Sequence, residues 1–289
     1  MRVIRAEVLG MCFGVRDALK AIAKVENPEG TTIHGELVHN PVVLVDLEER
    51  GFSSTAEDRR DAIPSTPNVL ITAHGISDRE RKRLESAGKT LIDTTCPLVV
   101  RVHQAAKQLA DDGYHVVLIG KPGHVEVRGI TEDLESFTVV SSPEDVASYP
   151  HSRIGIISQS TTPESLAKAV RDAVFDRNPQ ADIRWVDTIC LPTKEHQRAL
   201  ERLLDQVSAV VVVGGRNSNN TRELVRRCRE RGASAWHVES ADDLDDSWFD
   251  GISTVGLTAG TSTLDATIDA VHDALSRIGK PRVLVAAGR

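Results

Sequence analysis

The chain has 289 residues and a formal net charge of −7, with 40% hydrophobic, 27% charged and only 3% aromatic residues, a composition typical of a globular protein with a sizeable core. The negative charge and the scarcity of aromatic side chains argue against a nucleic-acid-binding surface and against broad binding to an anionic membrane. The sequence has no apolar run long enough for a signal peptide or a membrane span, so we expect a cytoplasmic protein whose cysteines stay reduced.

Strands and helices are predicted to alternate along the whole chain. The first cycle begins with a helix after Cys12 and continues with strands in residues 32–40, 68–77 and 90–96. Helices after Cys96 and Cys190 open two further cycles, with strands predicted in residues 116–124, 154–163, 182–190, 209–218 and 254–263. This alternation is typical of parallel sheets covered by helices on both faces.

The third cycle lacks a closing strand, because the chain runs out after its last predicted helix at about 262–278. Residues 2–12 have the same character as the strands that precede Cys96 and Cys190, so we expect the N-terminal strand to complete the third unit. We therefore predict an α/β protein of three αβα domains with parallel sheets. The expected boundaries are 13–96, 97–190, and 191–280 together with 1–12, followed by a C-terminal tail at 281–289.

Three sets of polar residues recur in step with these cycles, at separations of 84 to 102 residues. The sets are Cys12, Cys96 and Cys190; His39, His124 and Ser218; and His74, Ser160 and Ser262. In parallel α/β sheets the loops beyond the carboxyl ends of the strands form the binding site. Because each residue follows a predicted strand, we expect the three sets to converge on one site.

Three converging thiols indicate a metal centre, although the residues alone leave its nature open. Structural zinc usually takes four ligands from close pairs such as C-x₂-C, which this chain lacks, and catalytic zinc on three cysteines is less usual. An iron–sulfur cluster normally has four cysteines, and a 4Fe-4S cluster held by three leaves one iron open to a substrate oxygen. The other interpretation is three small buried residues that close strand–helix turns. Each cysteine is also expected at a helix start, which favours the thiolate.

Nine ordered segments, spread over all three cycles, resemble one family of enzymes. They are GMCFGV (10–15), LVHN (37–40), TAHGIS (72–77), DTTCPLV (93–99), GHVEV (123–127), SQST (158–161), DTIC (187–190), GGRNSNNT (214–221) and TAGTS (258–262). In these segments the chain resembles the 4-hydroxy-3-methylbut-2-enyl diphosphate reductases over essentially its whole length. The resemblance implies a trefoil of three αβα domains around a central 4Fe-4S cluster. It also implies two-electron removal of the allylic hydroxyl, giving isopentenyl and dimethylallyl diphosphate in the last step of the methylerythritol phosphate route to isoprenoids.

The resemblance assigns roles to individual residues. Cys12, Cys96 and Cys190 match the cluster ligands, and the substrate hydroxyl would bind the open iron. Glu126 matches the proton source, beside His124; a carboxyl in a closed pocket can have a pKa high enough to donate a proton. The residues that match substrate and diphosphate contacts are His39, His74, His124, Ser160, Ser218, Asn219, Asn220 and Ser262. Hydroxyls, amides and imidazoles that can be protonated suit such an anion.

Some features stay open at this stage. Ser160, Asn219 and Val125 stand where the family usually has threonine, serine and proline, which leaves the diphosphate contacts and the product ratio undetermined. The sequence has no flavin- or nicotinamide-binding motif, so the family implies an external electron donor such as ferredoxin or flavodoxin. Cys228 has no counterpart in the repeat, and we expect a structural role for it.

Two other classes of function remain as alternatives. A non-catalytic iron–sulfur or anion-binding sensor on the same scaffold would not need the carboxyl of Glu126 beside an anion pocket. A cluster-free sugar- or phosphate-binding protein would not need three cysteines in register. Iron and sulfide content after anaerobic isolation, followed by turnover on the allylic diphosphate, separates these interpretations.

Overall fold

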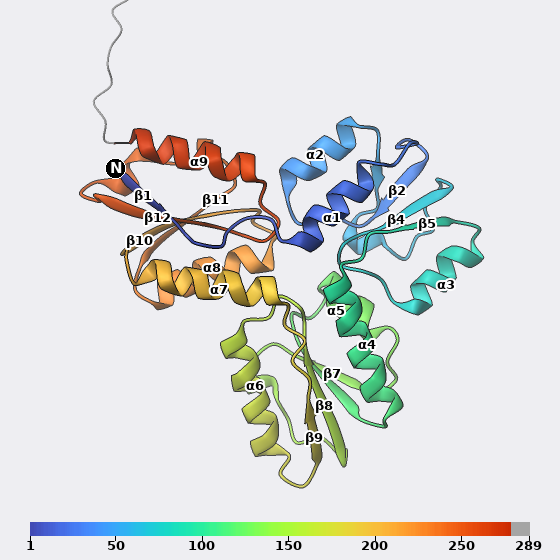
Figure 1. The fold of residues 1–289 in the computed structure, drawn as a ribbon. Coiled ribbons are helices and arrows are strands. Elements are labelled where there is room, and N and C mark those ends of the chain that lie inside the picture. The colour runs from blue at the N-terminus through green and yellow to red at the C-terminus, as the bar shows by residue number, and fades with distance from the viewer. Residues whose placement is uncertain (279–289) are drawn as a thin grey trace, which may run out of the picture. The chain divides into compact units, whose positions relative to one another are not determined.

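Within residues 1–278 the strands form three four-stranded sheets (Figure 1) in which every pairing is parallel. The computed structural model describes residues 1–278, so the predicted tail at 281–289 lies outside the described residues. The three parallel sheets with flanking helices confirm the predicted α/β class. Within residues 1–278, no helix combines the length and the hydropathy that a membrane crossing requires.

The described chain divides into two compact units. The larger unit runs from Cys12 to Glu195 and contains two of the sheets. The smaller unit combines Met1–Met11 with the chain from His196 onward and contains the third sheet. The predicted boundaries of three domains, 13–96, 97–190, and 191–280 with 1–12, remain a prediction.

The first sheet of the larger unit has the strand order β3-β2-β4-β5. Its elements are α1 (Phe13–Ile22), β2 (Thr31–His34), α2 (Pro41–Glu49), β3 (Ser53–Ser54), the short 3₁₀ helix η1 (Glu57–Arg59), β4 (Asn68–Ile71), α3 (Asp78–Ser86) and β5 (Thr90–Asp93). The strand predicted in 32–40 ends at His34 because Gly35 turns the chain with φ +102°. The rest of that segment forms a loop beyond the end of the sheet.

The second sheet of the larger unit has the order β7-β6-β8-β9. Its elements are α4 (Pro97–Asp111), β6 (His115–Ile119), α5 (Val125–Thr131), β7 (Phe137–Val140), η2 (Pro143–Asp145), β8 (Arg153–Ser158), α6 (Glu164–Arg177) and β9 (Asp182–Trp185). Helices α4 and α5 pack on one face through Val102 and Ile130. Helix α6 packs on the other face through Val170 and Val174. Because β6 is buried on both faces, it is apolar almost throughout.

The sheet of the smaller unit has the order β1-β12-β10-β11. Its elements are β1 (Arg2–Arg5), α7 (Leu191–Leu204), which begins in the larger unit, β10 (Ala209–Val213), α8 (Asn219–Glu230), β11 (Ser234–Val238), η3 (Ala241–Asp243), η4 (Asp246–Phe249), β12 (Thr254–Ala259) and α9 (Asp265–Arg277). The N-terminal strand β1 pairs with β12 from Arg2 opposite Thr254. It therefore occupies the position that β5 and β9 hold in the other sheets.

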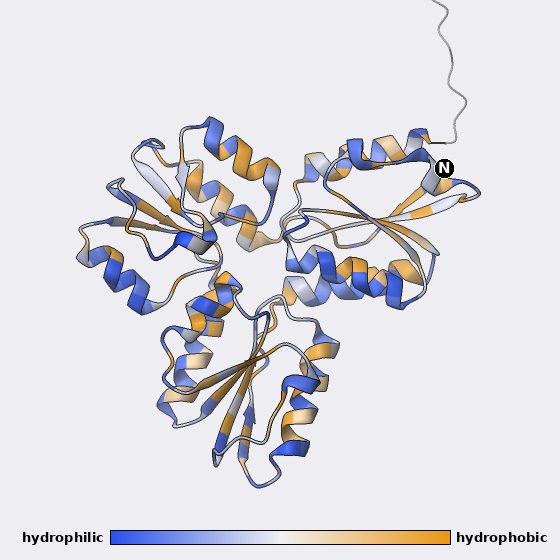
Figure 2. Cartoon of the chain, turned by 180° about the vertical axis from the view of Figure 1, so that it is seen from behind, coloured by the Kyte–Doolittle hydropathy of each residue, from blue (hydrophilic) through white to orange (hydrophobic). Residues whose placement is uncertain are grey.

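Each sheet is a sandwich of apolar strands between amphipathic helices. In Figure 2 the apolar residues follow the strands and the helix faces turned toward them, whereas hydrophilic residues cover the outer faces. In the smaller unit, Leu200 and Leu224 pack on one face of the sheet, and Val271 and Leu275 pack on the other. Burial of these two faces places the polar loops at the strand ends, where the candidate site lies.

Candidate active site

Every residue predicted for the site lies beyond the carboxyl end of a strand or at the start of the helix that follows it. In the larger unit, the loops and helix starts after β2, β4 and β6 carry His39, His74 and His124. The loops after β5 and β9 end in Cys96 and Cys190, and Ser160 follows β8. Parallel pairing brings these ends to one edge of each sheet.

Three histidines of the larger unit, His39, His74 and His124, form an imidazole cluster. The ring centroids of His39 and His74 lie 4.5 Å apart in a stacked arrangement. His124 meets both rings edge-on, at 5.5 Å from His39 and 5.8 Å from His74. Three residues from three separate loops therefore present their rings to one another.

Two local contacts orient the outer rings of this cluster. Glu36 Oε2 lies 2.8 Å from His39 Nδ1. The Nδ1 atom of His124, the N-cap residue of α5, accepts a hydrogen bond from the backbone N–H of Glu126 at 3.1 Å. Since that nitrogen accepts, the proton of a neutral His124 is on Nε2.

His74 is partly buried in this cluster. Burial lowers the pKa of His74 well below 6.5, and the neighbouring His39, His124 and Arg60 lower it further. Its Nδ1 atom is buried and has no hydrogen-bond partner in the described structure. These effects favour the neutral imidazole of His74 in the ligand-free protein. An anion in contact with the ring would favour the charged form and reverse part of this shift.

Glu126, on the first turn of α5, is a buried carboxyl with 2% of its surface exposed. Its Oε1 accepts from the Ser160 backbone N–H at 2.7 Å, and its Oε2 accepts from the Ser160 hydroxyl at 2.9 Å. Burial raises the pKa of Glu126 to about 7, although the hydrogen bonds from Ser160 and Gln159 oppose the rise. At neutral pH the carboxyl is thus able both to hold and to release a proton.

The three cysteines are free thiols at helix starts. Cys12 and Cys96 are the N-cap residues of α1 and α4, and Cys190 directly precedes α7. Burial raises the pKa of Cys96 and brings that of Cys190 to about 11, with Cys12 and Glu126 adding in the same direction. The predicted stabilisation of the thiolates by helix N–H groups is present but is outweighed by burial. A bound metal centre would displace these protons.

The thiol of Cys96 lies close to the start of α1, the helix that follows Cys12. A Cβ atom on Gly14 would lie 2.5 Å from Cys96 Sγ, so glycine is needed for α1 to approach that thiol. Residues 1–278 contain no group of three His, Cys, Asp or Glu side chains arranged to hold one metal ion. Cys12 lies close enough to Cys96 and Cys190 to contribute to the raised pKa of both thiols. Three cysteines of this kind are ligands that an iron–sulfur cluster takes.

The smaller unit carries the other predicted contacts. Ser218 caps α8 and accepts from the Thr221 N–H at 3.3 Å. Asn219 accepts a hydrogen bond from Arg222 at 2.5 Å. Asn220 is 3% exposed, and neither its amide nitrogen nor its amide oxygen has a partner in the described structure. Ser262 is buried in the loop after β12. Because an unpaired buried amide costs free energy, Asn220 is the member of this set most suited to receive a ligand.

Four supporting residues were not predicted from the sequence. Glu36 holds His39, and Thr193 Oγ1 lies 3.1 Å from Cys190 Sγ. Gln159 interacts with Glu126 and accepts from the Lys121 N–H at 3.2 Å. Arg60 contributes to the electrostatic field at His74. The position of Thr193 three residues after Cys190, at a helix start, is a signal that capping rules could have used; the other three have no local signal.

Parallel sheets with thiols, imidazoles and a proton-bearing carboxyl at their strand ends define an α/β enzyme of the metal-dependent redox class. The family model described as LytB protein matches residues 3–276. The chain belongs to the LytB family, the family of the 4-hydroxy-3-methylbut-2-enyl diphosphate reductases.

Two relatives with that name span nearly the same length. The chain is 35% identical to the enzyme of Streptomyces coelicolor over 285 residues, covering 96% of this chain and 84% of the relative. It is 34% identical to the enzyme of Aquifex aeolicus over 286 residues, covering 96% of both. Relatives of this similarity confirm the family that the nine segments predicted.

Solved structures confirm the fold. A structure described as (E)-4-hydroxy-3-methyl-but-2-enyl diphosphate reductase, the terminal enzyme of the non-mevalonate pathway, matches with a TM-score of 0.67 and 33% identity, covering 96% of this chain and all of that one. The corresponding Plasmodium falciparum reductase matches with a TM-score of 0.87 at 24% identity, covering 97% and 89%. The three-sheet architecture is therefore that of the family.

Proposed function

We propose that this chain reduces (E)-4-hydroxy-3-methylbut-2-enyl diphosphate to isopentenyl and dimethylallyl diphosphate at a 4Fe-4S cluster. Cys12, Cys96 and Cys190 would hold the cluster and leave one iron without a protein ligand. The observation that carries the proposal is Glu126, a buried carboxyl with a pKa of about 7 that interacts with two of the thiols and lies beside the imidazole cluster. A proton source between a redox centre and an anion site fits reductive removal of a hydroxyl.

The reaction defines what the protein must supply. The allylic C–O bond breaks, two electrons and two protons enter, and the hydroxyl leaves as water while the allyl carbon chain gains one hydrogen. When bound, the cluster would supply the electrons and a Lewis-acidic iron, and the electrons would reach it from an external carrier such as ferredoxin or flavodoxin. The protein's own residues would supply the proton for water and hold the diphosphate.

Glu126 and Ser160 would form the proton-donating pair. The Ser160 N–H and hydroxyl fix both oxygens of the Glu126 carboxyl, so its orientation is set before substrate arrives. Once Glu126 gives up its proton, the same two donors stabilise the carboxylate. His124, whose Nδ1 accepts from the Glu126 N–H, links the segment that carries the carboxyl to the imidazole cluster, and its Nε2–H would donate to the diphosphate.

Imidazole, hydroxyl and amide groups would bind the diphosphate. His39, His74 and His124 provide imidazole N–H groups on the larger unit, and neutral donors come at lower desolvation cost than charged ones. The smaller unit offers Ser218, Asn219, Asn220 and Ser262, of which Asn220 has both amide atoms without partners in the described structure. Binding of the anion would also draw protons onto the imidazoles and strengthen these hydrogen bonds.

Anaerobic isolation followed by turnover tests the proposal. We expect a brown protein with about four irons and four acid-labile sulfides per chain, as the 4Fe-4S assignment requires, and reduction of the allylic diphosphate with a strong artificial donor. A colourless protein without iron or sulfide would remove the cluster. A brown protein that does not turn over the substrate would favour the sensor alternative.

A further inference from the structure

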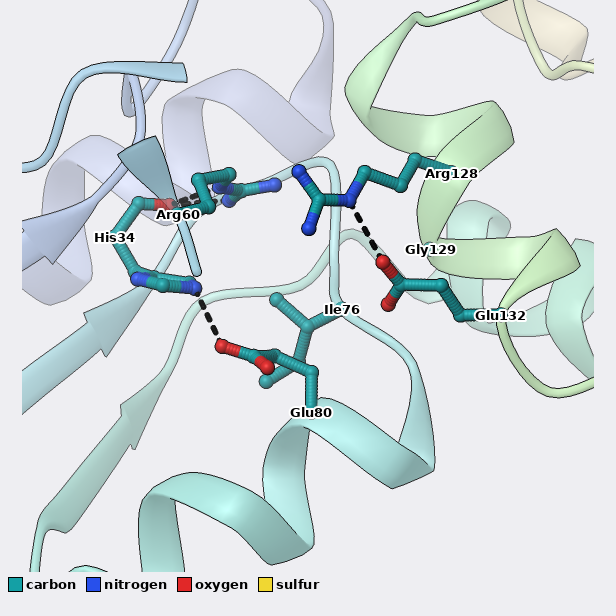
Figure 3. A pocket seen from close by; sticks show the side chains of 7 residues that line it. All are labelled: His34, Arg60, Ile76, Glu80, Arg128, Gly129 and Glu132. Atoms are coloured by element: carbon teal, nitrogen blue, oxygen red, sulfur yellow. Dashed lines mark hydrogen bonds and ion pairs between the residues drawn. The ribbon is translucent and has the colours of Figure 1, made fainter. Parts of the chain in front are cut away.

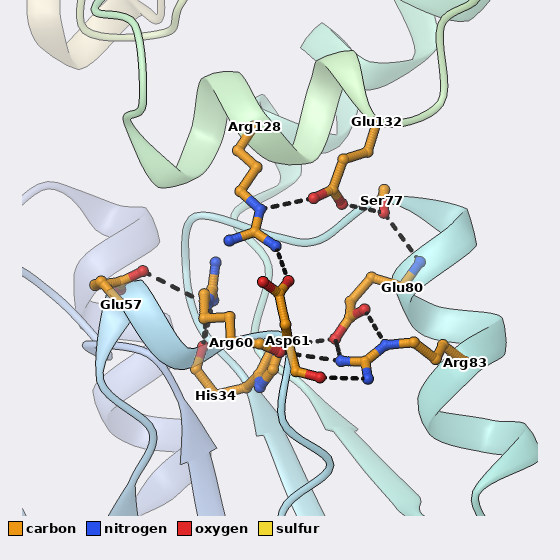
Figure 4. A network of polar contacts seen from close by, with 9 residues as sticks. All are labelled: His34, Glu57, Arg60, Asp61, Ser77, Glu80, Arg83, Arg128 and Glu132. Carbon is orange, nitrogen blue, oxygen red and sulfur yellow. Dashed lines mark hydrogen bonds and ion pairs between the residues drawn. The ribbon is translucent and has the colours of Figure 1, made fainter.

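The three segments that carry His39, His74 and His124 continue into one network of ionic and polar contacts. Figure 4 shows this positioning network, which consists of His34, Glu57, Arg60, Asp61, Ser77, Glu80, Arg83, Arg128 and Glu132. His34 precedes His39 by five residues, Glu80 follows His74 by six, and Arg128 follows His124 by four. The network thus joins β2, α3 and α5, which lie next to the residues of the imidazole cluster in the chain, to Glu57, Arg60 and Asp61 at η1 and just after it.

The first link joins the loop of His39 to the start of α3. His34 Nε2 lies 3.0 Å from Glu80 Oε1, and their side chains are 1% and 15% exposed. Burial alone would raise the pKa of Glu80, but hydrogen bonds from His34 and Arg83 outweigh it and lower the pKa to about 2. Glu80 is therefore an ionised anchor between the two segments.

The second link joins the start of α3 to α5, the helix that carries Glu126. The Ser77 hydroxyl accepts from the Glu80 N–H at 2.9 Å and donates to Glu132 Oε2 at 2.7 Å. The other oxygen of Glu132 accepts from Arg128 Nε at 2.7 Å. Through Glu132, the end of α5 is held against the residues that follow His74.

The third link is Arg60, a guanidinium with 5% exposure. It donates to the His34 carbonyl from both Nε and Nη2. It also pairs with Glu57, whose Oε1 accepts from the Glu36 N–H at 2.9 Å. The same Glu36 holds His39 through its carboxylate. A Cβ atom on Gly35 would lie 2.5 Å from Glu57 Oε1 and 2.9 Å from Arg60 Nε, so the loop is shaped around this arginine.

The network does not form a second ligand site. Figure 3 shows the cavity inside it, where Arg60 and Arg128 point toward one another above His34 and Glu80. Its volume is about 10 Å³, which is room for a single water molecule. Its three guanidiniums are matched by four carboxylates, so it has no positive excess to attract an anion. Its effect must come through the segments that it joins.

We propose that this network is a positioning device for the imidazole cluster, with Arg60 and Glu132 as its two principal members. It sets the spacing of His39, His74 and His124, and therefore the affinity of the larger unit for a diphosphate group. The inference rests on the proposed function, in which these histidines bind the diphosphate. A displaced charge-assisted hydrogen bond costs about tenfold or more in affinity, so the loss of either principal member is expected to be measurable.

Calorimetric binding of inorganic pyrophosphate, together with KM and kcat on the holoenzyme, tests the proposal in Arg60→Met and Glu132→Gln. A long-range charge effect would weaken pyrophosphate binding in the first variant and strengthen it in the second. A positioning network weakens binding in both, by about tenfold in Kd and KM, with a smaller change in kcat and unchanged iron content. Arg60→Lys should restore only part of the affinity, because an ammonium cannot reproduce the guanidinium fork.

Arg227→Met and Glu223→Gln in the smaller unit are the matched controls. Arg227 Nε lies 3.2 Å from Glu223 Oε1, with both side chains largely buried. We expect these controls to lower Tm without changing Kd. The proposal would be overturned if the network variants had a lower Tm but an unchanged Kd for pyrophosphate. It would also be overturned if Arg60→Met and Glu132→Gln changed that Kd in opposite directions. If Arg60→Met fails to fold, Glu132→Gln and Ser77→Ala test the proposal in its place. Unchanged pyrophosphate binding in both of these variants would equally overturn the proposal.

The same measurements separate this inference from the proposed function. A wild-type protein that binds pyrophosphate but does not reduce the allylic diphosphate contradicts the proposed reaction and leaves the network test intact. If the wild-type protein reduces the substrate and both network variants bind pyrophosphate with the wild-type affinity, only the network proposal is contradicted.

Discussion

Replacing Glu126 by glutamine removes the buried proton donor while keeping the shape of the side chain. Glutamine can still accept from the Ser160 N–H through its Oε1, because the hydrogen bond from Ser160 N to Glu126 Oε1 needs only a carbonyl oxygen. The Ser160 hydroxyl, which donates to Oε2 in the native protein, would rotate to accept from the new amide. We therefore expect the variant to fold and to retain its iron.

The size of the effect follows from the pKa of Glu126, which burial raises from 4.5 to about 7. At pH 7 about half of the Glu126 carboxyls hold a proton, against roughly 0.3% for an ordinary glutamate. Burial thus increases the protonated fraction of the Glu126 carboxyl on the order of 150-fold at this pH. Loss of a positioned general acid typically costs about 10² to 10⁴ in rate, and we expect Glu126→Gln to fall in that range.

The assay is anaerobic turnover with a strong artificial donor from pH 5.5 to 9, alongside iron and sulfide content. Wild-type kcat should be level below pH 7 and should fall about tenfold per pH unit well above it, because only the protonated Glu126 donates. The residual rate of Glu126→Gln should lack this decline. Glu164→Gln, at the start of α6, is the matched control, because that carboxyl is not one of the site residues and pairs with Lys168 at 3.5 Å. A variant that keeps more than a tenth of the wild-type rate at pH 7 with a full cluster would refute Glu126 as the donor, as would a wild-type rate level up to pH 9.

Three further changes have defined outcomes. Ser160→Ala should move the fall in the pH–rate profile of kcat upward by about one pH unit, because it removes a hydrogen bond that holds the pKa of Glu126 down; an unmoved profile would contradict the Ser160–Glu126 pairing. Cys96→Ser should lose its iron, whereas Cys228→Ser should keep it, because Cys228 is a fully buried core residue; equal iron content in the two variants would exclude Cys96 as a ligand. Glu80 should lower the stability of the protein in acid, because its pKa of about 2 in the folded state lies below the ordinary 4.5. The unfolded chain therefore takes up the proton at a higher pH than the folded chain does. On the order of 2 kcal/mol of the free energy of unfolding is lost as the pH falls from 4.5 to 2. Denaturant titrations across that pH range measure the free energy of unfolding of wild type and of Glu80→Gln. An equal loss in the two proteins would contradict the role of Glu80.

Local sequence patterns were sufficient to predict the central strands, which are buried on both faces, and the amphipathic helices. The apolar runs of β6 and β10 and the amphipathic spacing of α4 predict their structure directly, since burial of both strand faces requires them to be apolar. The edge strands β3, β7 and β11 were not predicted. The opposite edge strands, β1, β5 and β9, were predicted, so pairing on one side does not by itself hide a strand. β3 has only two residues, both exposed, which is too short for any apolar pattern. The end of β2 was also missed, because it depends on the positive φ of Gly35.

The sequence by itself determined the chemical inventory of the site. Three sets recur at matched intervals, because each member follows a strand end in a repeated αβα unit: Cys12, Cys96 and Cys190; His39, His124 and Ser218; and His74, Ser160 and Ser262. Glu126 was assigned through the segment that resembles the family. That periodicity is a property of the chain and can be read without coordinates.

Only the tertiary structure decided the chemical state of these groups. The raised pKa of Glu126, the neutral state of His74 and the protonated thiols of Cys96 and Cys190 all follow mainly from burial. The partners that modify this burial, such as Ser160 for Glu126, come from distant parts of the chain. Desolvation and charge interactions depend on the distances between atoms after folding, and no local pattern in a sequence records those distances.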